Sequence, residues 1–101
     1  MKDLYSIAVD VDTNLLRVGG ELTFSTVNDI LKQSQALFDP IKKLDIDLVN
    51  VTRSDSAGLV LLVEWIRSAN QANKKIVFHN IPEQMLAIAT ASGLDELLPL
   101  Q

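Results

Sequence analysis

Residues 44–73, LDIDLVNVTRSDSAGLVLLVEWIRSANQAN, contain the transition that decides the fold. An apolar strand pattern, Leu44 to Val49, leads through a short polar loop, 50–55, into a long apolar helix pattern. Free backbone N–H groups at a helix start favour acceptors and negative charge, so Asp55 or Ser56 can cap this helix. Ser56 is also a candidate for phosphorylation or for contact with a partner. Helix cap and functional site both remain open for this junction.

The segment before this transition predicts a hairpin followed by a helix. Residues 4–11 alternate apolar and small or polar side chains, a turn signal spans 12–14, and 15–22 form a second strand pattern. Gly19-Gly20 interrupts the second strand and indicates a bulge or a closely approached backbone. Apolar residues at helical spacing then predict an amphipathic helix over 24–38.

The segment after the transition adds one more strand and helix. KIVFH, residues 75–79, predicts a strand, and 82–92 a helix with Pro82 in its first turn. Leu97-Leu98 closes the chain as a short helix or edge strand. The order β-β-α-β-α-β-α predicts one α/β domain over 1–101, with a four- or five-stranded mixed sheet. We expect a hairpin at one edge and helices packed mainly on one face, with Asp45 and Asp47 on the open or polar face.

The helix that follows the junction is apolar on more than one side. One stripe contains Leu59, Leu62, Val63, Ile66 and Ala69, and a second contains Leu61, Trp65, Ser68 and Ala72. Two stripes mean either that other helices enclose this helix or that one stripe meets another protein. Trp65 is compatible with both interpretations, because tryptophan is common in cores and at interface hot spots.

Composition excludes several classes of function. The chain has 101 residues, 48% of them hydrophobic, a net charge of −4 and no cysteine. The nine Lys and Arg residues are scattered, which argues against nucleic-acid binding. Without cysteine there can be no disulfide and no thiolate metal site. No apolar run has the length of a signal-peptide core or a membrane span, so we expect a soluble cytoplasmic domain.

The residues that could support catalysis are few. His79 is the only histidine and lies inside a strand pattern, which favours a structural or surface role. Ser56 lacks the glycine elbow of typical serine nucleophiles. The chain contains no phosphate-binding glycine loop and no carboxylate cluster with metal-ligand spacing. The sequence therefore predicts a protein that is not an enzyme and uses no cofactor and no metal.

Several segments, in order along nearly the whole chain, resemble STAS domains, which anti-sigma factor antagonists and the tails of sulfate transporters share. They are Gly20-Glu21-Leu22, Ile46-Asp47-Leu48, Val51-Thr52, Asp55-Ser56-Ala57-Gly58-Leu59 and Ser92-Gly93-Leu94. The resemblance implies the fold predicted above and a binding or regulatory role without catalysis.

Two branches of this family compete. Anti-sigma factor antagonists usually have a second hydroxyl residue after the serine and a small residue after Gly-Leu, where this chain has Ala57 and Val60. The segments 20–24, 55–65 and 93–99 more closely resemble MlaB, the cytoplasmic STAS subunit of the Mla phospholipid-transport ABC system. We therefore favour the MlaB branch. An anti-sigma factor antagonist that is switched by phosphorylation of Ser56 remains the alternative.

The MlaB resemblance implies a partner and a binding surface. The partner is the ABC transporter ATPase subunit, and through it the inner-membrane permease, in a system for outer-membrane lipid asymmetry. The chain would support assembly or activity of the ATPase from the cytoplasm, peripheral to the inner membrane and without inserting into it. The implied partner-binding residues are Asp55, Ser56, Ala57 and Gly58 at the helix start, with Leu61 and Trp65 extending the contact.

Overall fold

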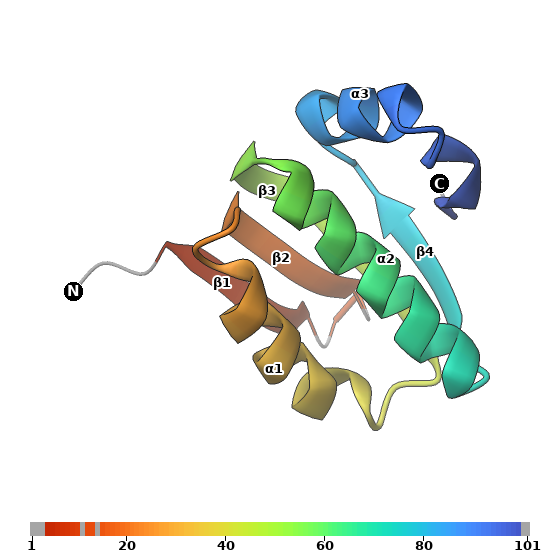
Figure 1. Cartoon of the computed structure of the whole chain (residues 1–101). Coiled ribbons are helices and arrows are strands. Elements are labelled where there is room, and N and C mark those ends of the chain that lie inside the picture. The colour runs from red at the N-terminus through yellow and green to blue at the C-terminus, as the bar shows by residue number, and fades with distance from the viewer. Residues whose placement is uncertain (1–3, 11, 14, 100–101) are drawn as a thin grey trace.

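The computed structural model describes residues 4–10, 12–13 and 15–99, and Figure 1 shows two long helices lying across one face of a twisted sheet. The elements follow the predicted order, with a 3-10 turn near the C-terminus. They are β1 (Tyr5–Asp10), β2 (Leu15–Leu22), α1 (Val27–Phe38), β3 (Lys43–Ser54), α2 (Ser56–Gln71), β4 (Lys75–His79), α3 (Glu83–Ala91) and η1 (Asp95–Leu97).

The sheet has the strand order β1-β2-β3-β4. β1 and β2 pair antiparallel as a hairpin, whereas β3 pairs in parallel with both β2 and β4. The predicted mixed sheet with a hairpin at one edge is confirmed, with four strands among the described residues. The first strand was also expected to include Val11, and the turn Asn14; both lie outside the described residues.

The strand β3 is longer than the sequence pattern predicts. The segment 50–55 was expected to be a loop, but residues 50–54 pair with the second half of β2. Exposed polar residues such as Thr52 and Arg53 occupy this extension, so the apolar alternation that marks a strand is missing. β4 pairs with β3 only as far as Asp47. The end of β3 therefore projects past β4 and positions the start of α2 at that end of the sheet.

The glycine pair in β2 produces the expected irregularity. The register of β2 against β3 shifts between Arg17 and Gly19 and again between Gly20 and Glu21. Gly20 has a φ of +80°, and a Cβ atom there would collide with the carbonyl of Leu4. Only glycine adopts this backbone conformation without strain while another strand lies so close.

The core lies between the sheet and the helices. Side chains that alternate along the strands point toward the helices and are buried, and α1 and α2 cover them (Figure 1). The predicted packing of helices on one face is therefore confirmed. The buried strand residues include Leu16, Val18, Leu22, Leu44, Ile46, Leu48, Ile76 and Phe78.

The other face of the sheet has polar side chains that bind one another. Arg17 lies 3.4 Å from Asp10 and 3.3 Å from Asp47. Asp47 also accepts a hydrogen bond from the Asn80 side chain at 3.0 Å, and the His79 ring contacts Asp45 at 3.0 Å. This confirms the expected polar face, and it places the only histidine there in a contact with a neighbouring strand.

Helix α2 is enclosed on two sides by the chain itself. Its second apolar stripe packs against α1, where the Trp65 ring lies 5.5 Å from the Phe38 ring, centroid to centroid. The indole N–H of Trp65 donates to Ser34 Oγ at 2.9 Å, and Ser34 Oγ donates to the carbonyl of Leu31 at 2.8 Å. The two helices therefore share a buried hydrogen bond as well as apolar packing.

Gly58 lets the first turn of α2 approach β2 closely. A Cβ atom at this position would lie 2.6 Å from the carbonyl oxygen of Leu22 and 3.1 Å from the terminal carbon of Met85. The nearer neighbour is backbone, which cannot rotate away as a side chain can. Within the described part of the chain, no helix is both long enough and apolar enough to cross a membrane.

We predict that Gly58→Ala lowers the free energy of unfolding by about 1–3 kcal/mol, because the helix must shift away from β2. Alanine's intrinsic helix preference, about 1 kcal/mol over glycine, offsets only part of this strain. Urea denaturation followed by the fluorescence of Trp65, the only tryptophan, measures the change. A variant as stable as the parent would show that this close approach imposes no constraint.

We predict that Ser34→Ala destabilises the chain by about 1–3 kcal/mol, because the buried indole N–H loses its acceptor. The matched control is Ser68→Ala, which removes an exposed hydroxyl from α2 and should stay within about 0.5 kcal/mol of the parent. Equal unfolding midpoints for both variants would contradict a structural role for this hydrogen bond.

Candidate functional site

The start of α2 is capped by Asp55. Asp55 has extended backbone angles and is the residue before the helix, and its Oδ1 accepts the N–H of Ala57 at 2.9 Å. This resolves the choice that the sequence left open between Asp55 and Ser56. Because the carboxylate is the cap, Ser56 is the first residue of the helix, and its side chain is exposed.

The same carboxylate also holds the loop before α1. Asp55 Oδ2 accepts the N–H of Phe24 at 3.1 Å, and the N–H of Asp55 donates to the carbonyl of Leu22 at 3.3 Å. Thr26 Oγ1 accepts the N–H of Thr23 at 3.0 Å. The loop between β2 and α1 is therefore fixed to the start of α2 by hydrogen bonds between segments far apart in the sequence.

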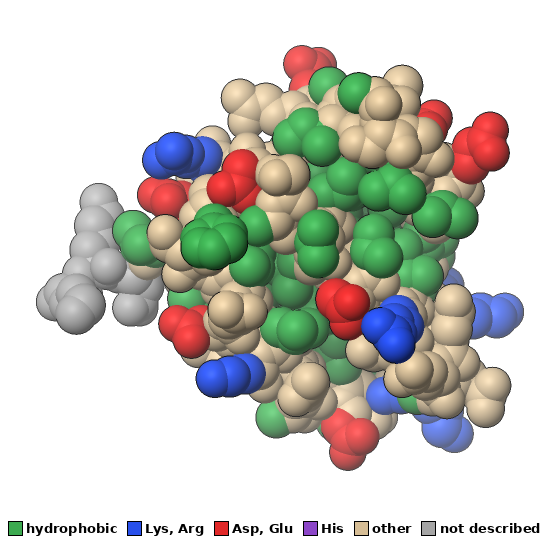
Figure 2. Space-filling model, in the orientation of Figure 1, with side chains coloured by type: hydrophobic (Ala, Val, Ile, Leu, Met, Phe, Trp, Pro, Cys, Tyr) green, Lys and Arg blue, Asp and Glu red, His purple; other side chains and the backbone are tan. Residues whose placement is uncertain are grey.

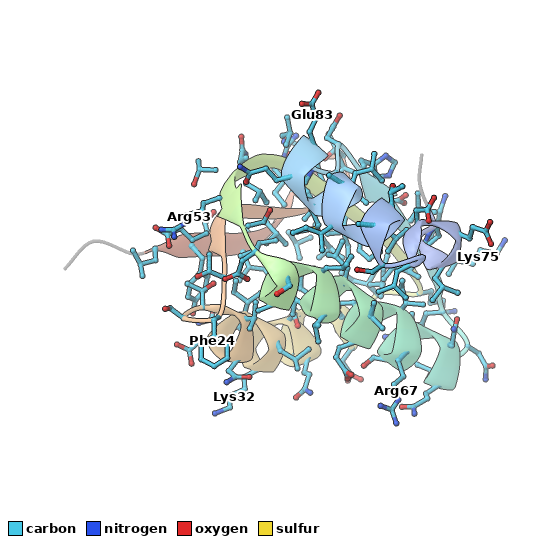
Figure 3. All side chains as sticks on the ribbon, turned by 45° about the horizontal axis from the view of Figure 1, so that its top comes forward. Phe24, Lys32, Arg53, Arg67, Lys75 and Glu83 are labelled. Atoms are coloured by element: carbon cyan, nitrogen blue, oxygen red, sulfur yellow. The ribbon has the colours of Figure 1, made fainter. Side chains whose placement is uncertain are left out.

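Phe24 lies on this loop with its side chain exposed to solvent. The sequence pattern placed it in the first turn of a helix beginning at 24, but α1 begins at Val27 and Phe24 precedes it. Its side chain is 84% exposed and lies at the end of α1 nearest the start of α2 (Figure 3). Phe24 is a candidate contact residue because its ring is exposed and its backbone is held beside the start of α2 by the hydrogen bond to Asp55.

Three of the sequence-predicted contact residues are not on the surface. Trp65 is 1% exposed and Leu61 is 2% exposed, because α1 packs over the stripe that they form. Gly58 is buried against β2. Leu61 and Trp65 are therefore buried in the isolated chain, and their contact with a partner stays a prediction. Asp55, Ser56 and Ala57 do lie together at the helix start, with Ser56 the most open of the three.

An apolar groove runs between the first two turns of α1 and α2, beside Ser56. Its volume is about 420 Å³, and Val60, 58% exposed, lies along it. Figure 2 shows hydrophobic side chains gathered on this face of the molecule. The residues that line the groove are Phe24, Val27, Asn28, Leu31, Ser56, Ala57, Val60, Leu61 and Glu64.

Phe24 and Val60 were not expected to be contact residues from the sequence. Val60 belongs to an apolar run that is typical of a core, and Phe24 falls on the apolar face of the helix pattern over 24–38. Helical spacing does not show which positions a neighbouring helix leaves uncovered. For Phe24, the polar cluster Thr23, Ser25 and Thr26 was a signal that the helix begins later.

The groove contains few charged side chains, whereas the face of the sheet away from the helices contains several. Glu64 is the one charged side chain among the described residues that line the groove. On the opposite face, the backbone N–H of Asp12 donates to Asp10 and holds the pKa of that carboxyl below its usual value, with Arg17 contributing in the same direction. No three His, Asp or Glu side chains are grouped as metal ligands within the residues that the structure describes.

Comparison with known proteins places this geometry in a family. The profile of the STAS_2 family, described as "Mlab, STAS domain", matches residues 6–99. A chain of the Acinetobacter MlaFEDB complex, in its ATP-bound Vtrans2 conformation, superposes with a TM-score of 0.80 and 26% identity. The match covers 95% of this chain and 99% of that one.

Anti-sigma factor antagonists are also similar. The anti-sigma-B factor antagonist of Staphylococcus epidermidis is 27% identical over 88 residues, covering 82% of this chain and 78% of that protein. The phosphorylated form of the Bacillus cell fate determinant SpoIIAA has a TM-score of 0.67, with 96% and 90% of the two chains covered. At 19% identity, SpoIIAA shows a shared fold alone. The profile match over nearly the whole length establishes that the chain belongs to the MlaB-type STAS domain family.

Proposed function

We propose that this chain is a non-catalytic STAS subunit that binds the ABC ATPase of a phospholipid-transport system and supports its assembly or activity. The observation that carries the proposal is the end-to-end match to a chain of the MlaFEDB complex. The family match over residues 6–99 supports the same assignment. By this assignment the chain works in the cytoplasm, at the inner membrane through its complex, and it reaches the permease only through the ATPase.

The surface proposed for ATPase binding is the start of α2. Ser56 is exposed and Ala57 half-buried, so the backbone of a partner can approach without meeting a large side chain. Asp55 has both carboxylate oxygens bound to backbone N–H groups, which fixes the shape of this surface before a partner arrives. A preformed surface loses less conformational freedom on binding and therefore favours affinity.

A binding role fits the placement of the few reactive side chains better than catalysis does. His79, the only histidine, contacts Asp45 on the sheet face that α2 does not cover. It therefore lies away from the Ser56 hydroxyl and cannot act as its general base in this arrangement. Ser56 serves in this proposal as a contact residue, and no step of the proposed role requires a bond to be made or broken.

A second function is favoured by the similarity to the anti-sigma-B factor antagonists. In this alternative, phosphorylation of Ser56 by a kinase switches binding to a different partner. A phosphate on Ser56 would add about −1.5 to −2 charges beside Asp55. The helix start favours that charge, whereas the neighbouring carboxylate opposes it.

We predict that Ser56→Arg weakens the complex with the cognate ABC ATPase by about tenfold or more, because a long charged side chain must be accommodated where the backbones approach. Ser56→Glu should weaken it as well. The measurement is co-purification from cells that express both proteins, followed by titration of the purified components.

The matched control is Ser92→Arg, which places the same side chain on an exposed serine at the end of α3. A positive charge at the first turn of α2 costs about 0.3–1 kcal/mol of stability, so thermal melting must confirm that the Ser56 variant is folded at the binding temperature. A folded Ser56→Arg protein that binds as well as the control would show that this surface is not the interface.

The intact mass of the protein from its native cell distinguishes the two functions. The ATPase-binding function predicts an unmodified chain that co-purifies with transporter subunits. A large fraction carrying one phosphate on Ser56, together with a kinase-like partner, would instead support the anti-sigma factor antagonist function.

A further inference from the structure

No described segment of the chain fills the groove between α1 and α2, and the two helices hold its walls in place. Phe24 forms one end of it and is held there by the hydrogen bond to Asp55. Leu61 contributes to its lining, and Val60 stands exposed at its edge. Water covers Phe24 and Val60 in the isolated chain, so a binding partner that displaces this water gains free energy.

We propose that this groove receives one large apolar side chain from an amphipathic helix of the ATPase, and that a Lys or Arg on the same helix pairs with Glu64. The inference rests on the proposed ATPase-binding function. The inference goes beyond that function in two respects. It assigns Phe24 and Val60 as the residues that contact the partner's apolar side chain, and it assigns a positive charge to the segment that binds.

The lining of the groove favours an amphipathic helix over a small polar ligand. Among the described residues that line the groove, only Asn28, Ser56 and Glu64 are polar, and two of them are uncharged. A polar metabolite would leave most of its hydrogen-bonding groups facing hydrocarbon, which is costly. An amphipathic helix instead presents an apolar face to such a groove and keeps its polar face in water.

The position of Glu64 sets the charge of the expected segment. Glu64 follows Ser56 by two helical turns, about 12 Å along the axis. Its present ion-pair partner is Arg67, 3.9 Å away and 69% exposed. Such an exposed pair contributes little stability, so a cation on a partner can replace Arg67 at small cost.

A second copy of this chain is a poor occupant by the same argument. In a two-fold pairing the Glu64 residues would approach the same interface from both chains, with no cation among the described lining residues to compensate. The net charge of −4 on each chain adds a general repulsion. Charge complementarity therefore selects a basic partner segment.

Cysteine protection tests the occupant of the groove directly, because the natural chain has no cysteine. Val60→Cys places a thiol at the edge of the groove, and Leu97→Cys places one at a residue of nearly equal exposure, 58% against 60%, away from the groove. Alkylation by iodoacetamide is followed by intact mass with and without excess ATPase. We expect binding to slow alkylation of the Val60→Cys variant by at least about tenfold, and to leave the rate of the Leu97→Cys variant unchanged.

Several outcomes would overturn the assignment. Equal protection of the two variants would place the contact elsewhere. Protection of the Val60→Cys thiol that grows with the concentration of the chain alone would make a second copy the occupant. Protection of that thiol by phosphatidylglycerol vesicles without ATPase would make the occupant a lipid surface.

Charge reversal tests the pairing at Glu64. Glu64→Lys should weaken ATPase binding about tenfold or more, whereas Glu83→Lys, an exposed reversal on α3 (Figure 3), should leave it unchanged. Equal effects of both reversals would overturn the proposed ion pair.

Failure of the groove proposal can be told apart from failure of the proposed function. An ATPase that binds the parent chain and is blocked by Ser56→Arg, yet leaves the thiol of Val60→Cys unprotected, would refute the groove proposal alone. An ATPase that fails to bind the parent chain would refute the proposed function itself.

Discussion

The carboxylate of Asp55 is the constraint on which the proposed binding surface depends. One oxygen caps α2 through the N–H of Ala57, and the other binds the N–H of Phe24 in the loop before α1. A single side chain thereby caps α2 and holds the loop that leads into α1, and these two helices follow neighbouring parallel strands. An ordinary N-cap stabilises one helix by about 1 kcal/mol. Here the cap also decides which side chains stand beside Ser56, and so it connects the stability of α2 to the shape of the surface.

The packing of α1 against α2 explains why the surface is small. The second apolar stripe of α2 is covered, and the Trp65 indole is held by Ser34 inside the core. What remains uncovered is the first two turns, where α1 and α2 leave a groove between them. Gly58 brings this end of α2 close to β2, and small side chains at the helix start keep it accessible. The opposite face of the sheet is occupied by ion pairs and hydrogen bonds among strand residues, which leaves the helical face as the apolar one.

Much of the fold could be predicted because its signals are local. Alternation located β2, and β4 followed from its β-branched and aromatic residues, both with their observed bounds. The end of β3 could not be predicted, because its pairing with β2 replaces the missing apolar pattern. The candidate site was predicted in part: Asp55 and Ser56 stand at the helix start, whereas Trp65 is core. Two features depend on contacts between distant segments. They are the covering of one stripe of α2 by α1 and the hydrogen bond between Asp55 and Phe24. No periodicity within one segment encodes them.

The start of α2, the loop at Phe24 and the groove between α1 and α2 form one continuous surface. We propose that the ATPase binds this surface and leaves the polar sheet face free. Titration of the isotope-labelled chain with unlabelled ATPase, followed by loss of backbone amide NMR signals, tests the claim residue by residue. We expect the earliest losses to cluster at Phe24, Ser56 and Val60. Early losses confined to Arg17, Asp45 and His79, with the start of α2 unaffected, would contradict it.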